Sequence, residues 1–338
     1  MNWIINDWYK AGDRIETISP EGSFKTTWGC YKAVCIASGN DCLGHRVKQG
    51  AVVIVDNETP RSSLENHLNR FSQYLGFKDY NDLPIHIYPD RSFVFDRKTE
   101  LDELLKFISK KKPVYIGLDS LLSMLPLGRQ QNLHENSSQL GGVLGRDLLD
   151  ILKKAGDAVT DLAVHTKKPV SDYNIEQLAH NDIQSLVRGH GSIVGQGADS
   201  CLILKKISEH PAPTRFCIIT RSRRTALPMD SKLTYVELIE QHYGHGMAHL
   251  EEIDPLSLPP LEEAKQVYGM LKDLAQTDVK TREIVKELAL LNKVQIRQAL
   301  QDLVKHKAIN KVKAGRSYHI NPNIRIDCNK NYSDELNK

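Results

Sequence analysis

The segment 14–38 reads RIETISPEGSFKTTWGCYKAVCIAS and indicates the fold class of the first part of the chain. Residues 14–18 alternate as in a short strand, and residues 28–38 contain few helix breakers, which favours a helix. A glycine-containing segment joins the two. A strand, a loop and a helix in this order can bind phosphate, because the free backbone N–H groups at a helix N-terminus attract anions.

The connecting segment SPEGSFKTT has the features of a phosphate-binding loop. Its amides could surround phosphate oxygens, Lys25 could reach the outer phosphates, and Thr26 could ligate magnesium. The pattern G-x-x-x-x-G-K-[ST] is broken twice, at Ser19 and at Phe24, so a surface turn is the alternative interpretation of the loop alone. The residues predicted to bind the phosphates of ATP are Gly22, Ser23, Phe24, Lys25, Thr26 and Thr27.

Two acids follow later apolar runs in the same part of the chain. Asp119 ends the run VYIGL and is placed to hold Mg²⁺ through its coordinated water, while Glu58 follows AVVIVD and could polarise the attacking water as a general base. A helix cap or strand-end acid is the alternative for Asp119, and a solvated turn residue is the alternative for Glu58. The order of loop, acid and acid favours the nucleotide site.

Strands alternate with helices up to about residue 245, which predicts a mainly parallel sheet covered on both faces, an α/β fold. The predicted strands are 14–18, 51–56, 83–88, 113–120, 158–164, 200–205 and 215–220, and the predicted helices are 28–38, 62–76, 99–109 and 137–155.

The composition is that of a globular protein. With 338 residues, 40% of them hydrophobic, and a mean hydropathy of −0.40, the chain is expected to form about two domains. No apolar run reaches the roughly 20 residues of a membrane span, and the first residues do not resemble a signal peptide, so we expect a cytoplasmic protein without a membrane partner. The net charge of +3 neither demands nor excludes nucleic acid.

The C-terminal part is predicted to form a second, smaller domain. We predict an ATPase domain at 1–245, a proline-containing linker at 246–260, a winged helix at 261–322 and a disordered tail at 323–338. The winged-helix prediction rests on helices at 261–275, 279–290 and 293–306 followed by two short strands around Ala314 and Gly315.

The third of these helices and the hairpin carry polar and basic side chains suited to duplex DNA. A protein-interaction module or a solvated basic face is the alternative. The predicted DNA-binding residues in this module are Lys293, Gln295, Arg297, Gln298, Lys311, Lys313 and Arg316.

Over roughly residues 3 to 225, the chain resembles the RepA-type hexameric helicases of plasmids and mobile elements, within the RecA and DnaB-like group. The motifs that carry the resemblance are PEGSFKTTW (20–28), VVIVDNETP (52–60), IGLDSLLSMLPLG (116–128), ENSSQLGGVLGRDLLDIL (135–152), AVHTKKP (163–169), VRGHGSIVGQGADSCLIL (187–204) and IITRSRRTALP (218–228).

The resemblance implies a RecA-like P-loop core, ATP and Mg²⁺ as ligands, and assembly into a ring. It implies that Glu58 is the catalytic base and that His165 senses the γ-phosphate. A DNA-contacting segment is usual in this family around residues 170–190, which includes Arg188. Arg221 and Arg223 take the places of a K-x-R pair that reaches into the neighbouring subunit's site, where a guanidinium can stabilise phosphoryl charge. The alternative for these two arginines is a solvated basic turn.

The leading hypothesis is therefore an ATP-dependent DNA helicase or translocase, with single-stranded DNA in the ring and duplex DNA at the winged helix. The first alternative is a nucleotide-gated DNA-binding regulator or loader that does not separate strands. The second is a recombinase-like filament ATPase, which the match to RepA-type spacing disfavours. The fold alone cannot separate these, because a RecA-like core serves all three.

Overall fold

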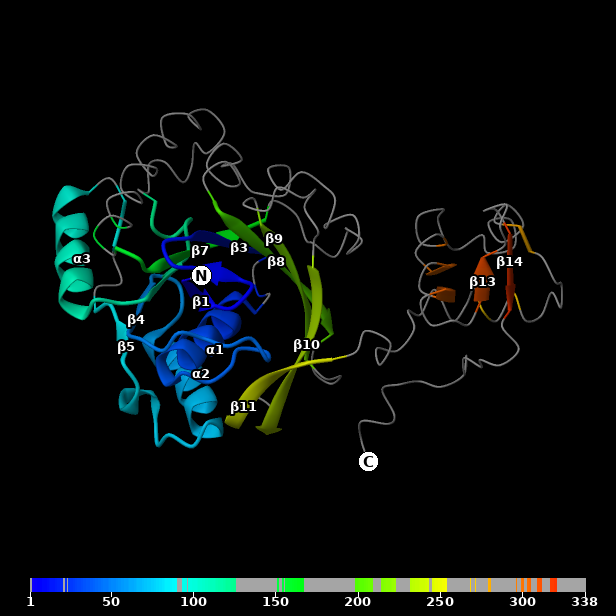
Figure 1. Cartoon of the computed structure of the whole chain (residues 1–338), viewed down its shortest axis with the longest axis horizontal. Helices are drawn as coiled ribbons and strands as arrows, with labels where there is room; N and C mark the ends of the chain where they lie inside the picture. The colour runs from blue at the N-terminus through cyan, green and yellow to red at the C-terminus, as the bar shows by residue number, and fades with distance from the viewer. Residues whose placement is uncertain are drawn as a thin grey trace. The chain divides into compact units, whose positions relative to one another are not determined.

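The computed structural model shows two compact units, Met1–Glu252 and Ile253–Lys338, which are described separately (Figure 1). The residues that it describes are 2–20, 22, 24–89, 93–95, 97–125, 151, 154, 156–166, 198–208, 214–222, 232–242, 245–253, 268, 271, 279–280, 296, 299–300, 303–304, 309–311 and 317–320. In this part of the chain, no helix is both long enough and apolar enough to span a bilayer.

A nine-stranded mixed sheet forms the centre of the first unit, in the order β11-β10-β9-β8-β3-β7-β6-β4-β5. The six strands from β8 to β5 in this order are parallel, which confirms the predicted α/β fold with a mainly parallel sheet and is consistent with a RecA-like core. The strands are β3 (Arg14–Ser19), β4 (Val52–Asp56), β5 (Ile85–Ile87), β6 (Tyr115–Asp119), β7 (Val159–His165), β8 (Ser200–Ser208), β9 (Arg215–Ser222), β10 (Lys232–His242) and β11 (His245–Glu252).

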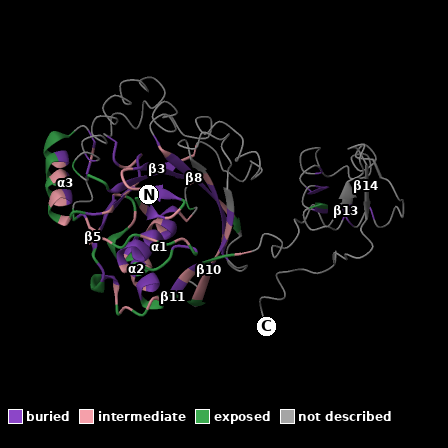
Figure 2. Cartoon of the chain, in the orientation of Figure 1, coloured by how far each residue is buried: buried purple, intermediate pink, exposed green. Residues whose placement is uncertain are grey.

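Helices cover both faces of this sheet, because its central strands are apolar on both sides. In β4, Val52 and Ile54 pack into one apolar cluster, whereas Val53 and Val55 pack into another. The first cluster includes α1 (Lys25–Ser38) and α2 (Arg61–Tyr74), and the second includes α3 (Lys98–Lys111). The buried core residues of the three helices and the sheet are purple in Figure 2.

Three short elements complete the described part of the first unit. A two-stranded sheet of β1 (Trp3–Ile5) and β2 (Tyr9–Lys10) packs into the cluster of α1 and α2, and a 3₁₀ turn, η1 (Tyr80–Asp82), precedes β5. No pattern in the sequence predicts these elements.

Strands β10 and β11 extend the sheet beyond the predicted elements and correct one predicted boundary. Residues 246–252 lie in β11, which pairs with β10, so the prediction of a linker at 246–260 is wrong over these residues. Contacts with α2 hold the extension in place: Arg70 forms an ion pair with Glu240, and its Nε donates to the carbonyl of Gly246 at 3.0 Å. The first unit therefore continues to Glu252.

The second unit contains a three-stranded sheet in the order β12-β14-β13, made of β12 (Val279–Lys280), β13 (Ile309–Lys311) and β14 (Ser317–Ile320). The antiparallel pair β13 and β14 agrees with the predicted hairpin around Ala314 and Gly315. Strand β12 lies where the helix at 279–290 was predicted to begin, so the start of that helix is corrected. The winged helix itself stays a prediction, because most residues of its helices lie outside the described part.

Candidate functional site

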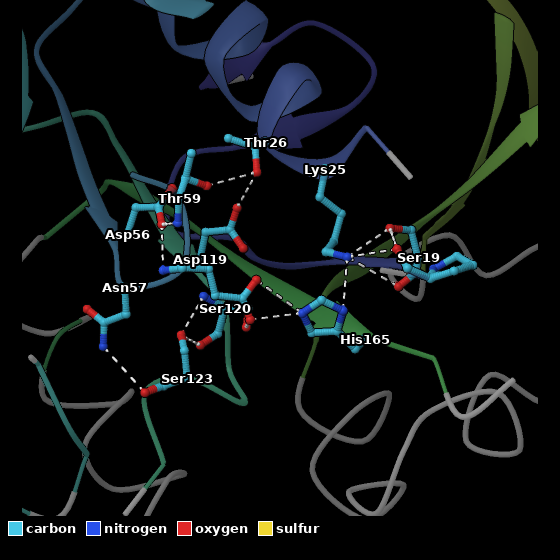
Figure 3. A network of polar contacts seen from close by, with 12 residues as sticks. Ser19, Lys25, Thr26, Asp56, Asn57, Thr59, Asp119, Ser120, Ser123 and His165 are labelled. Carbon is cyan, nitrogen blue, oxygen red and sulfur yellow. Dashed lines mark hydrogen bonds and ion pairs between the residues drawn. The ribbon is translucent and has the colours of Figure 1, made fainter. Parts of the chain in front are cut away.

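The polar residues predicted to bind nucleotide meet where β3, β4, β6 and β7 end (Figure 3). Parallel strands end at the same edge of a sheet, and ligands of open α/β sheets bind beside that edge. Helix α1 begins at Lys25, six residues after the end of β3, so its N-terminus lies at this edge too.

The start of α1 is arranged to receive an anion. The helix has no acidic residue in its first turn and no side-chain hydrogen bond at its N-cap, Phe24. The N–H groups at such a terminus favour a negatively charged partner. Gly22, in the loop before the helix, has a φ of 70°, a left-handed conformation that glycine adopts without cost.

Phe24 also has a left-handed backbone, with a φ of 61°. The usual phosphate-loop pattern has glycine at this position, and a residue with a Cβ is strained there. Its ring stacks on Phe216 of β9, with ring centroids 5.6 Å apart and planes 15° apart. This aromatic contact offsets part of the backbone strain.

Lys25 is buried at the beginning of α1, and its ammonium group is surrounded by acceptors. It donates to the carbonyl oxygen of Pro20 at 3.0 Å, to Ser19 Oγ at 3.1 Å and to His165 Nδ1 at 3.2 Å. Ser19 replaces the first glycine of the usual pattern, so this departure supplies an extra acceptor for the lysine.

His165 connects Lys25 to Glu58. Its Nε2 lies 3.1 Å from Glu58 Oε1 and 3.3 Å from Oε2. A lysine ammonium can only donate, so Nδ1 of His165 accepts and the ring proton is on Nε2, from which it is donated to the carboxylate. Lys25, His165 and Glu58 thus form a continuous chain of hydrogen bonds, defined here as the Lys–His–Glu chain.

Glu58 accepts a second hydrogen bond at 2.5 Å from the hydroxyl of Ser120, which directly follows β6. Burial opposes ionisation of Glu58, but the hydrogen bonds from His165 and Ser120, together with the charge of Lys25, hold its pKa below the ordinary value. The carboxylate is therefore ionised at neutral pH. About a third of the side chain, 36%, is exposed, so a small molecule can reach it from solvent.

Thr26 and Asp119 lie beside this chain. Thr26 Oγ1 donates to Asp119 Oδ2 at 3.1 Å and lies 3.4 Å from the hydroxyl of Thr59. Burial, followed by the charges of Asp56 and Glu58, raises the pKa of Asp119 to about 7. A hydroxyl and a carboxylate in contact beside a phosphate loop are the groups that hold Mg²⁺ in P-loop proteins.

Asp56 ends β4 and is the register partner of Asp119 at the end of β6. Its Oδ1 accepts from the backbone N–H groups of Glu58 and Thr59 at 2.8 and 2.7 Å. Among the residues described, Asp56 Oδ2 and Asp119 Oδ1 are buried without a hydrogen-bond partner. Two such oxygens beside a threonine hydroxyl fit a hard divalent cation, which prefers oxygen ligands.

A buried polar cluster lies behind the site, between α1 and β7. Lys32 forms an ion pair with Asp161, which also accepts from the hydroxyls of Thr17 and Tyr115, both at 2.8 Å. The ammonium of Lys32 lies 5.2 Å from the ring centre of Trp28, close enough for a cation–π contact. This cluster connects the helix of the phosphate loop to the strand that ends in His165.

The structure brings most of the predicted phosphate and catalytic residues to one place. Those at the edge of the sheet are Gly22, Phe24, Lys25, Thr26, Glu58, Asp119 and His165, and Thr27 follows as a buried residue in the first turn of α1. The predicted residues that lie outside the described part are Ser23, Arg188, Arg223, Lys293, Gln295, Arg297, Gln298, Lys313 and Arg316. Only the backbone is described for Arg221, in β9, and for Lys311, in β13.

Three residues of the site were not predicted from the sequence, namely Asp56, Thr59 and, as a partner of Glu58, Ser120. Asp56 has the same local signal as Asp119, an acid that ends an apolar run, and this signal could have found it. Ser120 and Thr59 carry no such signal, since their contacts depend on the register of β4 and β6 and on the start of α1.

Comparison with known proteins gives one family match. The family model described as AAA domain matches residues 1–170, which is half of the chain. No curated protein matches the chain. Among solved structures, the crystal structure of the KaiC-like protein PH0186 from the hyperthermophilic archaeon Pyrococcus horikoshii OT3 is similar, with a TM-score of 0.43, 14% sequence identity and coverage of 74% of this chain and 94% of that chain.

Proposed function

We propose that this chain, which belongs to the AAA domain family, is an ATP-dependent DNA helicase or translocase of RepA type. In this proposal it works as an oligomeric ring in the replication of a plasmid or mobile element. The observation that carries the ATPase part is the Lys–His–Glu chain beside Thr26 and Asp119. In this proposal, the cation that binds phosphate, the carboxylate base and the Mg²⁺ site lie together at one edge of the sheet.

Lys25 and the N-terminus of α1 bind the phosphates in this proposal. The ammonium group exchanges its contacts with Ser19 and Pro20 for oxygens of the outer phosphates. Phosphate oxygens are stronger acceptors than a neutral hydroxyl or carbonyl because they are charged. His165 then loses its contact with Lys25 when nucleotide enters, which is how it would report an occupied site.

Thr26 and Asp119 would hold the Mg²⁺ that accompanies ATP, because they are the hydroxyl and carboxylate in contact beside the loop. When bound, this ion supplies neutralisation of the charge on the phosphate oxygens.

Glu58 acts on the attacking water. It is ionised, partly exposed, and held in one orientation by Ser120 and His165. A positioned carboxylate that accepts a proton from water contributes typically 10²–10⁴-fold to a rate. Ser120 and His165 are positioning residues here, because they act through Glu58.

The direction of β9 supports a site that a second subunit completes. Arg221 pairs with Cys201 of β8, and Cys201 pairs with Glu16 of β3. Glu16 lies three residues, or about 10 Å, before the end of β3, where the phosphates are proposed to bind. Strand β9 runs antiparallel to β8, so the chain leaves the phosphate edge before it reaches Arg221. If Arg221 and Arg223 act on a phosphoryl group, as the family resemblance implies, they would therefore act on the nucleotide of another copy.

DNA binding is supported by the second unit. In this proposal, the antiparallel pair β13 and β14 is the wing, and the sequence around it carries Lys311, Lys313 and Arg316. Basic residues on a wing bind phosphates and position a protein on duplex DNA without reading sequence. In this proposal, the ring encloses the single strand and the second unit recruits the motor.

The test measures ATP hydrolysis by the full-length protein with and without single-stranded DNA, strand displacement on a forked duplex, and particle mass by light scattering. The proposal expects turnover that rises with DNA, displacement that requires ATP, and a mass of several subunits. Glu58→Gln should abolish turnover, whereas Glu103→Gln, a change of the same kind at an exposed position of α3, should not.

Other results would contradict the proposal in distinct ways. Nucleotide binding without turnover, in a monomer or dimer that still binds DNA, would favour the nucleotide-gated regulator or loader. DNA-stimulated turnover without strand displacement, from helical filaments seen by electron microscopy, would favour the recombinase-like filament.

A further inference from the structure

We propose that Asp56 and Asp119, with the hydroxyls of Thr26 and Thr59, form a divalent-cation site that is occupied before nucleotide arrives. This inference rests on the proposed function, because it concerns the ion that accompanies ATP. It adds Asp56 and Thr59 to Thr26 and Asp119, the two residues expected to hold the ion. The protein would then bind the ion by itself, and the nucleotide would not be needed to carry it in.

The two carboxylates belong to the last residues of neighbouring parallel strands, and these two residues lie side by side in the sheet. Asp56 of β4 and Asp119 of β6 are register partners, and adjacent strands lie about 4.8 Å apart. Both residues and Thr26 line one partly open cavity of about 50 Å³. A cavity of this size has room for a small ion or one to two waters.

The remaining oxygens of the two acids are without a partner. Asp56 is only 5% exposed, and its Oδ1 is committed to the N–H groups of Glu58 and Thr59. Its Oδ2 and Asp119 Oδ1 are buried and have no hydrogen-bond partner in the described part of the chain. Burying a charged oxygen is costly unless it is paired or coordinates a metal, so these two oxygens indicate a missing cation.

The two threonines add neutral oxygens to the same place. Thr26 Oγ1 lies 3.1 Å from Asp119 Oδ2 and 3.4 Å from Thr59 Oγ1. Two carboxylates and two hydroxyls resemble the oxygen-only ligand sets of Mg²⁺ and Mn²⁺, which also keep several waters. The chain thus offers more ligands than the single carboxylate that a nucleotide-carried ion requires.

Lys25 and Lys32 line the same cavity and are the competing sources of positive charge. Lys32 forms an ion pair with Asp161, which also lines this cavity. The ammonium group of Lys25 donates to Ser19, Pro20 and His165 and is expected to bind phosphate once nucleotide enters. Because Lys25 is also expected to bind phosphate, it does not balance both carboxylates, and an excess of negative charge remains at Asp56 and Asp119.

A purely structural role is the competing interpretation of Asp56. Its Oδ1 shapes the turn that carries Glu58, and this alone could explain an acid at this position. Asp56→Asn separates the two roles, because the asparagine oxygen can still accept both N–H bonds while the second oxygen becomes an NH₂ group that cannot bind a cation. Asp102→Asn at an exposed position of α3 is the matched control.

The experiment titrates Mn²⁺ into the full-length, nucleotide-free protein and follows the loss of the free-ion signal by electron paramagnetic resonance. Circular dichroism checks the folding of each variant. The wild type and Asp102→Asn are expected to bind one Mn²⁺ per chain, and Asp56→Asn is expected to bind it about tenfold or more weakly, the scale at which partners of a metal site act. Binding of a fluorescent ATP analogue to the wild type in excess Mg²⁺ is measured in parallel, so that the proposed function is tested separately.

Two results would overturn the inference: no Mn²⁺ binding by the nucleotide-free wild type, or equal Mn²⁺ affinity in Asp56→Asn and the wild type. If either occurs while the ATP analogue binds, the cation site fails and the proposed function stands. If the analogue does not bind the wild type but the Mn²⁺ results are as expected, the proposed function fails and the cation site stands.

Discussion

His165 lies between Lys25 and Glu58, with its Nδ1 3.2 Å from the lysine ammonium and its Nε2 3.1 Å from the glutamate carboxylate. The residue expected to bind phosphate and the residue expected to activate water are therefore joined through one ring. Both contacts hold together only in the tautomer with the proton on Nε2. Entry of a phosphate that takes Lys25 away would free one side of the ring while Glu58 keeps the other.

Replacement of His165 by alanine is expected to slow ATP hydrolysis more than it weakens ATP binding. Glu58 would lose one of its two positioning contacts, and misplacement of a catalytic group by about 1 Å can cost roughly 100-fold in rate. Single-turnover hydrolysis and equilibrium binding of a fluorescent ATP analogue measure the two effects separately. His86→Ala in β5 is the control, and equal losses of binding and rate in His165→Ala would contradict the positioning role.

Asp119 predicts a pH dependence of stability in metal-free protein. Burial and the neighbouring charges of Asp56 and Glu58 raise its pKa from 3.8 to about 7, so between these values the folded chain binds a proton that the unfolded chain has released. Stability from this group is therefore complete below about pH 4 and is lost as the pH rises to 7. In EDTA at pH 8, Asp119→Asn should be more stable than the wild type, by at most about 4 kcal/mol.

Urea unfolding in EDTA at pH 4 and pH 8 measures this difference. At pH 4 the two proteins should be alike, since Asp119 is protonated in the folded wild type. A wild type that is more stable than Asp119→Asn at pH 8 without metal would show that the carboxylate is stabilised in its charged form.

Phe24 predicts an unusual order of stability among substitutions. The left-handed backbone is costly for any residue with a Cβ, while the stack on Phe216 is favourable. Phe24→Ala loses the stack and keeps the strain, whereas Phe24→Gly loses the stack and relieves the strain. The free energy of unfolding of the alanine variant should therefore be lower than that of the glycine variant by about 1 kcal/mol. Chemical unfolding of both variants tests this. Equal stabilities would mean that the backbone at Phe24 is not left-handed in solution.

The buried ion pair behind the site predicts strong coupling between Lys32 and Asp161. Lys32→Met leaves Asp161 as a buried charge with only its hydroxyl partners and should cost about 3–5 kcal/mol. The double change Lys32→Met with Asp161→Asn should cost less than the sum of the single changes, by at least about 1 kcal/mol. Additive effects in urea unfolding would show that the two residues do not stabilise each other.

In the first unit, the elements and site residues that could be predicted are those marked by a short pattern in the sequence around them. The strand, loop and helix of residues 14–38 follow from residue spacing alone, and Asp119 follows from the apolar run that it ends. The approach of Glu58 to Asp119 follows from the rule that parallel strands end at one edge. His165 was expected at the site only from family resemblance, because no local pattern distinguishes it from any histidine that ends a strand.

The parts that were missed depend on distant partners. Strand β10 carries Glu237 and Glu240 among its apolar residues, a pattern without a clear apolar face, and these charges are balanced by Arg215 of β9 and by Arg70 of α2. Such pairing becomes visible only when the fold is known. The three prolines and several acids in residues 246–260 predict a linker, yet the pairing of residues 246–252 with β10 makes them part of the sheet.

The reversal of chain direction at β9 has a consequence for symmetry. The proposed phosphate site lies where β3 ends, while Arg221 lies toward the end where β3 begins, so the two features are separated along the strand axis of one molecule. A contact that brings Arg221 of one copy to Lys25 of the next is heterologous, with different surfaces on its two sides. Repetition of such a contact closes into a circle when the rotation between neighbours divides a full turn and no translation along the rotation axis accompanies it, and otherwise winds into a helix. The geometry of this single contact would therefore decide between a ring and a filament.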